Sequence, residues 1–107
     1  MELEIYWTDF SKKALKDIFD YYKIKASLKV AKTLALGITE ESSKLKKQPT
    51  IGQVESLIND SEDFRYLVFK NYKIIYHINI KKKRVEILDV FDTRQNPIKL
   101  KRKNKNN

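Results

Sequence analysis

A chain of 107 residues has room for one folded domain and is too short for two. It carries 23 Lys and Arg residues against 14 Asp and Glu residues, a formal net charge of +9, and 41% apolar residues, which is enough for a hydrophobic core. The lack of cysteine excludes disulfide scaffolds, thiolate metal sites and thiol nucleophiles. No apolar run approaches the ~18 residues of a membrane span, and the acidic first residues do not resemble a signal peptide, so we expect a cytoplasmic protein.

Most of the excess positive charge lies near the end of the chain. Residues 99–107 contain five cations and no acid, so residues 1–98 carry 18 cations against 14 acids. Because residues 101–107 have no apolar anchor, we expect a single domain over residues 1–100, followed by a disordered basic tail over 101–107. The lysine-rich composition is compatible either with biased coding or with an anion-binding surface.

The first half of the chain predicts a strand and two helices. Residues 2–7 alternate between polar and apolar side chains, which is typical of a half-buried strand. Thr8 or Asp9 can cap a helix whose apolar residues recur at helical spacing, and Ser27 can cap a second helix. Gly37 lowers the helical propensity of the second segment by roughly 1 kcal/mol relative to alanine. Pro49 and Gly52 mark the end of the helical half.

From residue 64 onward the apolar residues recur with a period of two, which predicts three consecutive strands. These are Phe64–Lys70, Tyr72–Ile80 and Arg84–Phe91, joined by Asn71 and by the basic turn 81–83. The predicted class is therefore α+β: an N-terminal strand, a helical hairpin, and a three-stranded antiparallel meander with the helices on one face. In the second of these strands we expect one side to lie under the helices and the other to be open. The first side holds Tyr72, Ile74, Tyr76, Ile78 and Ile80, and the second holds Lys73, Ile75, His77 and Asn79.

The order of elements and three sequence stretches resemble the RelE/ParE superfamily of bacterial toxins from type II toxin–antitoxin modules. The stretches are Arg65–Ile78, Pro49–Leu57 and Val90–Pro97, and the likeness covers residues 2–100. The resemblance implies a curved antiparallel sheet with a helical hairpin on one side. It also implies one of two targets: RelE-like members cleave mRNA in the ribosomal A site without a metal, whereas ParE-like members are associated with inhibition of DNA gyrase.

If the chain is a nuclease, the resemblance implies four catalytic residues. Glu55 matches the carboxylate that some cleaving relatives use, Arg65 and Lys73 match the strand cations, and Arg94 matches an arginine that follows the last strand. The histidine of several cleaving relatives falls on Asp92, and a carboxylate cannot serve as a cationic acid at neutral pH unless burial raises its pKa strongly.

Each candidate also has a structural interpretation. Glu55 can be a solvated loop carboxylate, and Lys73 can be an ordinary surface lysine. Arg65 can pair with Asp63 or Glu86 across the sheet. His77 is the only histidine and a candidate acid or base because of its near-neutral ordinary pKa. The aspartates of the first helix have no His or Cys beside them, so we expect no metal site, and no cofactor.

Three functional hypotheses remain open at this point. The first is a growth-inhibiting toxin that is neutralised by an acidic, partly disordered antitoxin and acts either on mRNA or on gyrase. The second is a non-enzymatic nucleic-acid-binding module, which only the charge of +9 and the basic tail favour. The third is an inactive family member retained as a partner of its antitoxin.

Overall fold

The computed structural model describes residues 2–55 and 63–94. Within these ranges the chain forms two α-helices, one 3₁₀-helix and five strands, which confirms the predicted α+β class. In chain order they are β1 (Glu4–Trp7), α1 (Asp9–Lys25), α2 (Leu28–Ser43), η1 (Lys44–Lys46), β2 (Gln53–Val54), β3 (Phe64–Phe69), β4 (Tyr72–Asn79) and β5 (Arg84–Asp92). The predicted tail 101–107, like the domain boundary at residue 100, lies outside the described residues.

All five of these strands form a single sheet in the order β1-β5-β4-β3-β2. β1 pairs with β5 in parallel, and the other neighbours are antiparallel. The two-residue strand β2 was not predicted, because two residues are too few to show a period. A β-bulge interrupts the β4–β5 pairing: Ile75 lies opposite Asp89 while the next residue, Tyr76, lies opposite Ile87, so Leu88 is the extra residue.

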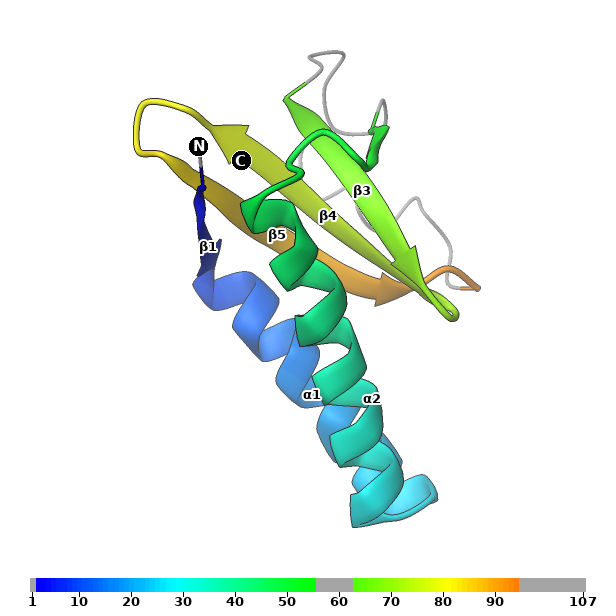
Figure 1. The fold of residues 1–107 in the computed structure, drawn as a ribbon. Coiled ribbons are helices and arrows are strands. Elements are labelled where there is room, and N and C mark those ends of the chain that lie inside the picture. The colour runs from blue at the N-terminus through cyan, green and yellow to red at the C-terminus, as the bar shows by residue number, and fades with distance from the viewer. Residues whose placement is uncertain (1, 56–62, 95–107) are drawn as a thin grey trace.

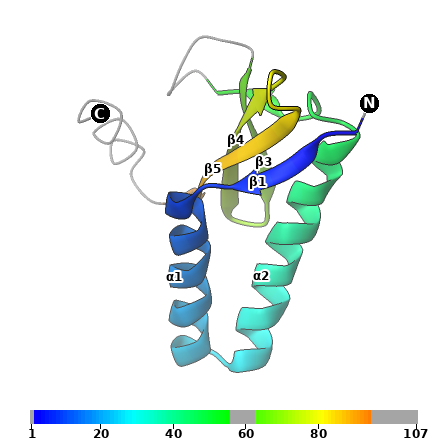
Figure 2. The same cartoon turned by 90° about the vertical axis from the view of Figure 1, so that its left-hand side faces the viewer.

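The two α-helices begin at the predicted capping residues. The Thr8 hydroxyl accepts a hydrogen bond from the Ser11 N–H (3.1 Å) and donates one to the carbonyl of Ile87 on β5 (2.9 Å), so the cap also ties α1 to the sheet. Ser27 caps α2 by accepting from the Val30 N–H. Figures 1 and 2 show the helical hairpin leaning on one face of the sheet and extending well beyond it. No helix in the described ranges is long and apolar enough to cross a membrane.

The core lies between the hairpin and the helix-covered face of the sheet. It contains Leu3, Leu34, Ile38, Leu45, Leu67, Tyr72, Ile74, Tyr76, Ile78, Val85, Ile87 and Val90. Gly37 has a packing reason, because a Cβ at this position would lie 2.3 Å from the Phe69 ring of β3. A glycine therefore lets α2 approach the sheet closely, which offsets its low helical propensity.

The opposite side of the sheet, which we call the polar face, is less open than predicted. Ile75 on this face is 0% exposed because it lies in the central strand, between Tyr66 of β3 and Asp89 of β5, and Asp89 is itself buried. The placement of Ile80 under the helices was also wrong. β4 ends at Asn79, so Ile80 falls in the following turn, where its side chain is 66% exposed.

Candidate functional site

Glu55 and Lys73 form a buried ion pair on the polar face. Glu55 follows β2, and its N–H donates to the Phe64 carbonyl of β3 at 2.7 Å. Its carboxylate lies 2.7 Å from the Lys73 ammonium of β4, and the two side chains are only 3% and 18% exposed. The ammonium also lies 4.0 Å from the centre of the Tyr66 ring, a cation–π contact. Both charges are therefore neutralised within the protein, and neither is the solvated side chain of the structural interpretation.

Arg65 points to the other face of the sheet. It lies opposite Tyr76, a core residue of the helix-covered face, and its guanidinium donates to the carbonyls of Gly52 (2.9 Å) and Thr50 (3.3 Å). The Tyr76 hydroxyl donates to the Pro49 carbonyl and accepts from the Gly52 N–H. Burial raises the pKa of Tyr76, so its hydroxyl stays protonated as a donor. The two side chains together hold segment 49–52 against the sheet.

Arg94 forms a two-point ion pair with Asp92 just beyond the last strand. Its Nη2 lies 2.5 Å from Asp92 Oδ2, and its Nε donates to Asp92 Oδ1 at 2.9 Å. These hydrogen bonds lower the pKa of Asp92 and raise that of Arg94. Asp92 is therefore an ionised hydrogen-bond acceptor, the opposite of what a proton donor requires. Nearby, the Tyr72 hydroxyl donates to the Tyr22 hydroxyl of α1, and burial raises the pKa of Tyr72.

The four residues that were candidates for a nuclease do not converge on one cavity. Glu55 and Lys73 meet each other on the polar face, whereas Arg65 reaches through the helix-covered side to segment 49–52. Arg94 lies 64% exposed past the end of β5, held by Asp92. The sheet separates the first pair from Arg65, because successive side chains of a strand point to opposite faces.

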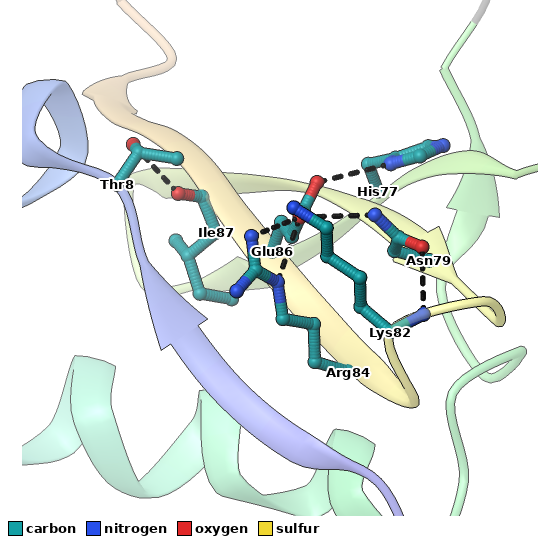
Figure 3. A network of polar contacts seen from close by, with 7 residues as sticks. All are labelled: Thr8, His77, Asn79, Lys82, Arg84, Glu86 and Ile87. Atoms are coloured by element: carbon teal, nitrogen blue, oxygen red, sulfur yellow. Dashed lines mark hydrogen bonds and ion pairs between the residues drawn. The ribbon is translucent and has the colours of Figure 1, made fainter.

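A second polar cluster on the polar face was only partly foreseen, through His77. Its centre is Glu86 of β5, whose carboxylate contacts Arg84 Nε (2.8 Å), Asn79 Nδ2 (3.2 Å) and His77 Nδ1 (3.3 Å), as Figure 3 shows. Burial opposes ionisation of Glu86, but the hydrogen bonds from Arg84, His77 and Asn79 outweigh it and lower its pKa. Because Glu86 contacts these residues, it is not the partner of Arg65.

Aromatic rings flank this cluster on both sides. The Arg84 guanidinium stacks over Tyr6 of β1 at 4.0 Å from the ring centre, and the His77 ring packs on Phe64 at 4.5 Å. The alternation of Arg84 and Glu86 in the sequence is the signal that could have identified the cluster, since alternate residues share one face of a strand.

A largely apolar groove of about 420 Å³ lies where α1 and α2 meet β1. Its lining consists of Trp7, Lys12, Leu15, Lys16, Phe19, Ala35 and Thr39. A hydrogen bond to Asp20 raises the pKa of Lys16. The groove therefore combines an apolar floor with lysine ammonium groups. No group of three or more His, Asp or Glu side chains in residues 2–55 and 63–94 is arranged to hold a metal ion.

A helical hairpin packed on one side of a curved, mainly antiparallel sheet defines the RelE/ParE class of folds, and similar solved structures bear this out. The toxin–antitoxin system ParDE of P. aeruginosa is similar with a TM-score of 0.70 at 17% identity, covering 85% of this chain and 96% of the other. The RelBE2 complex of Mycobacterium tuberculosis gives 0.64 at 14% identity, covering 86% and 99%. A mutant of the E. coli toxin RelE in which two arginines are replaced by alanine, in the free state, gives a TM-score of 0.58 at 14% identity, covering 94% of each chain.

The sequence profile described as the ParE toxin of the type II toxin–antitoxin system parDE matches residues 5–97. The chain therefore belongs to this toxin family, within the RelE/ParE superfamily, as the sequence resemblance implied. No curated protein matches the chain in sequence.

Proposed function

We propose that this chain is a growth-inhibiting toxin that acts on DNA gyrase in the cytoplasm and does not cleave mRNA. The observation that carries the proposal is the dispersal of Glu55, Lys73, Arg65 and Arg94 over two faces and one end of the sheet, each held by a contact within the protein. Membership in the ParE toxin family supports the same conclusion.

Metal-free RNA cleavage needs a base for the 2′-hydroxyl, cations beside the phosphorane and an acid for the leaving oxygen, all within reach of one phosphate. Here the carboxylate of the pair is neutralised by Lys73, at 2.7 Å. Asp92, in the place of the family histidine, has a lowered pKa and is ionised at neutral pH. The ion pair favours a structural role for Glu55, and an ionised Asp92 cannot donate the proton, so inhibition by binding is the mechanism that this arrangement supports best.

The proposal includes a cognate antitoxin as the neutralising partner. The solved relatives include ParDE and RelBE toxin–antitoxin systems. The groove beside α1 and α2 has the composition that an amphipathic acidic segment needs, because its apolar floor of Trp7, Leu15 and Phe19 lies next to the exposed Lys12. Such a segment would bury its apolar side in the groove and place a carboxylate beside this lysine.

The test is expression of the chain from an inducible promoter, with and without the neighbouring reading frame. We expect growth arrest with the chain alone, recovery on co-expression, and loss of plasmid supercoiling before growth stops. Purified protein added to purified gyrase should block ATP-dependent supercoiling in the absence of ribosomes, and the preformed complex with the antitoxin should not.

Mapping of mRNA 5′ ends in the arrested cells distinguishes the two targets. New ends within codons of translated messages, together with normal supercoiling, would contradict the gyrase proposal and restore the nuclease. In that case Arg65→Ala or Arg94→Ala should lower cleavage about 10²-fold or more. Normal growth at confirmed folded expression would identify an inactive family member.

A further inference from the structure

Seven cations gather at the end of the molecule where β1 and β5 begin. They come from two segments of the chain, Lys44, Lys46 and Lys47 around η1 and Lys81, Lys82, Lys83 and Arg84 at the β4–β5 turn, and we call them the basic pole. β1 joins the segments, because the Leu3 N–H donates to the Lys46 carbonyl and the next N–H, of Glu4, donates to the Lys83 carbonyl. The segments thus flank one strand and lie about two strand spacings, roughly 10 Å, apart.

Most of the charge of the basic pole is available to a partner. Lys44 pairs with Glu41 at 2.9 Å, and Arg84 pairs with Glu86 at 2.8 Å. The other five, all lysines with exposed side chains, make no ion pair within the described ranges. Glu4 is the acid that β1 places beside Arg84, so the surface keeps a clear excess of positive charge.

The β4–β5 turn is held in one conformation by the Glu86 cluster. Asn79 donates to Glu86 with its amide nitrogen and accepts from the Lys82 N–H with its amide oxygen, at 3.1 Å, as Figure 3 shows. The Lys83 N–H closes the turn on the Ile80 carbonyl at 3.0 Å. Lys83 itself has a φ of 52°, in the left-handed region that favours Gly or Asn. Glycine would adopt this backbone conformation at a lower energy, so the lysine adds a charge to the turn at the cost of backbone strain.

We propose that the basic pole binds duplex DNA, with the β4–β5 turn entering the major groove. The turn of residues 80–83 is the part of this hairpin that projects, because β1 pairs with β5 from Arg84 onward and β3 pairs with β4 up to His77. A turn one hairpin wide fits the B-form major groove, which is about 12 Å wide, whereas the A-form RNA major groove is too narrow for side chains to read. Duplex DNA carries one charge per about 1.7 Å of its axis, so a surface roughly 10 Å across faces about six phosphate charges. The inference rests on the proposed function, because gyrase acts on duplex DNA.

The test compares two variants that remove the same charge from opposite ends of the molecule. Lys81→Gln/Lys82→Gln/Lys83→Gln neutralises the turn, and Lys25→Gln/Lys29→Gln/Lys32→Gln neutralises three exposed lysines near the far end of the helical hairpin. Binding of a 20-base-pair DNA is measured against salt with gyrase absent. If all five lysines meet phosphates, the slope of log affinity against log salt is about −4.5, and the turn variant flattens it to about −1.8.

At 0.1 M salt the turn variant should bind DNA about 10²-fold or more weakly, whereas the hairpin variant keeps the slope of the unaltered chain. Asn79→Ala leaves the charge unchanged and loosens the turn, so its affinity should fall while its slope stays the same. Equal losses in the two triple variants would overturn the basic pole as the DNA site, and unchanged affinity in Asn79→Ala would overturn the role of the fixed turn.

Two further probes identify the polyanion. Duplex RNA of the same length should bind more weakly than DNA. RNA binding of equal or greater strength, or polyglutamate binding with the same dependence on the turn lysines, would overturn the assignment to DNA. Gyrase inhibition by the unaltered chain is measured separately, so inhibition by a chain that does not bind DNA rejects this inference alone. DNA binding without inhibition rejects only the proposed target.

Discussion

The Glu55–Lys73 pair provides the sharpest test of whether these two residues stabilise the fold or take part in catalysis. The N···O distance is 2.7 Å, and the side chains are 3% and 18% exposed. Lys73→Met removes the ammonium and keeps the aliphatic stem, leaving a buried carboxylate. Glu55→Gln keeps the shape of the carboxyl group and removes its charge. The double variant has neither charge and is expected to fold.

The magnitude follows from burial. Breaking a buried pair by removing one partner costs about 3–5 kcal/mol, whereas replacing both partners is often neutral. Lys73→Met should lie near the lower limit, about 3 kcal/mol, because the site is not fully enclosed on the lysine side. For a domain of this size that corresponds to a Tm lower by about 12–24 °C. Glu55→Gln should cost about 1–3 kcal/mol, since the ammonium retains the Tyr66 ring and some water.

Urea unfolding of the four proteins measures the coupling between the two side chains, and growth arrest measures toxicity in parallel. We expect the double variant to recover most of the stability that Lys73→Met loses and to remain toxic, because the proposed function gives the pair a structural role, holding the end of β2 to β4, and no part in chemistry. A Lys73→Met protein as stable as the original would refute the buried pair. A folded double variant without toxicity would refute its purely structural role.

Three further predictions concern other parts of the fold. Gly52→Ala should lower the free energy of unfolding by about 1–3 kcal/mol, because its Cβ would lie 2.6 Å from the Tyr66 backbone oxygen; wild-type stability in urea would contradict this. The pKa of Glu86 is lowered on folding, so its ionised form stabilises the folded state. This contribution to the free energy of unfolding is fully present above the unfolded pKa of about 4.3 and is lost as the pH falls through the lower folded pKa. The stability of Glu86→Gln should therefore depend less on pH below 5. Ala35→Phe should fill the groove beside α1 and weaken antitoxin binding in a titration while toxicity persists, and Thr33→Phe, an exposed position of α2, is the control that should bind normally.

Local patterns were sufficient for most of the secondary structure. The cap at Thr8, the cap at Ser27 and the change from helical to two-residue periodicity depend on neighbours a few positions apart, and the sequence displays them directly. The parallel pairing of β1 with β5 joins segments about 80 residues apart, and the bulge at Leu88 depends on the register between β4 and β5. No local pattern encodes such a pairing, so only the resemblance to a family could suggest the arrangement.

The candidate site was harder to predict than the fold. Periodicity assigns a residue to one side of its strand, but it does not identify the residue opposite. Arg65 was therefore expected to pair with Asp63 or Glu86. Glu86 instead contacts His77, Asn79 and Arg84, and the Arg65 guanidinium also donates to backbone carbonyls of segment 49–52, which periodicity could not indicate. The sequence did not identify Glu86 as the shared hydrogen-bond acceptor of the cluster. Only the register of β4 and β5 shows that Asn79 and Arg84 lie beside it.

The parallel pairing of β1 with β5 also determines when during synthesis the protein can become complete. Residues 4–7 leave the ribosome well before residues 84–87, with which they pair. A chain made from the N-terminus can form the local contacts of the helical hairpin early, but it cannot complete the sheet until nearly all of it is available. The same strand joins the two halves of the basic pole, so a nascent or truncated toxin lacks the assembled surface. Until translation of the chain is nearly finished, the nascent protein therefore has neither the complete sheet nor the complete basic pole.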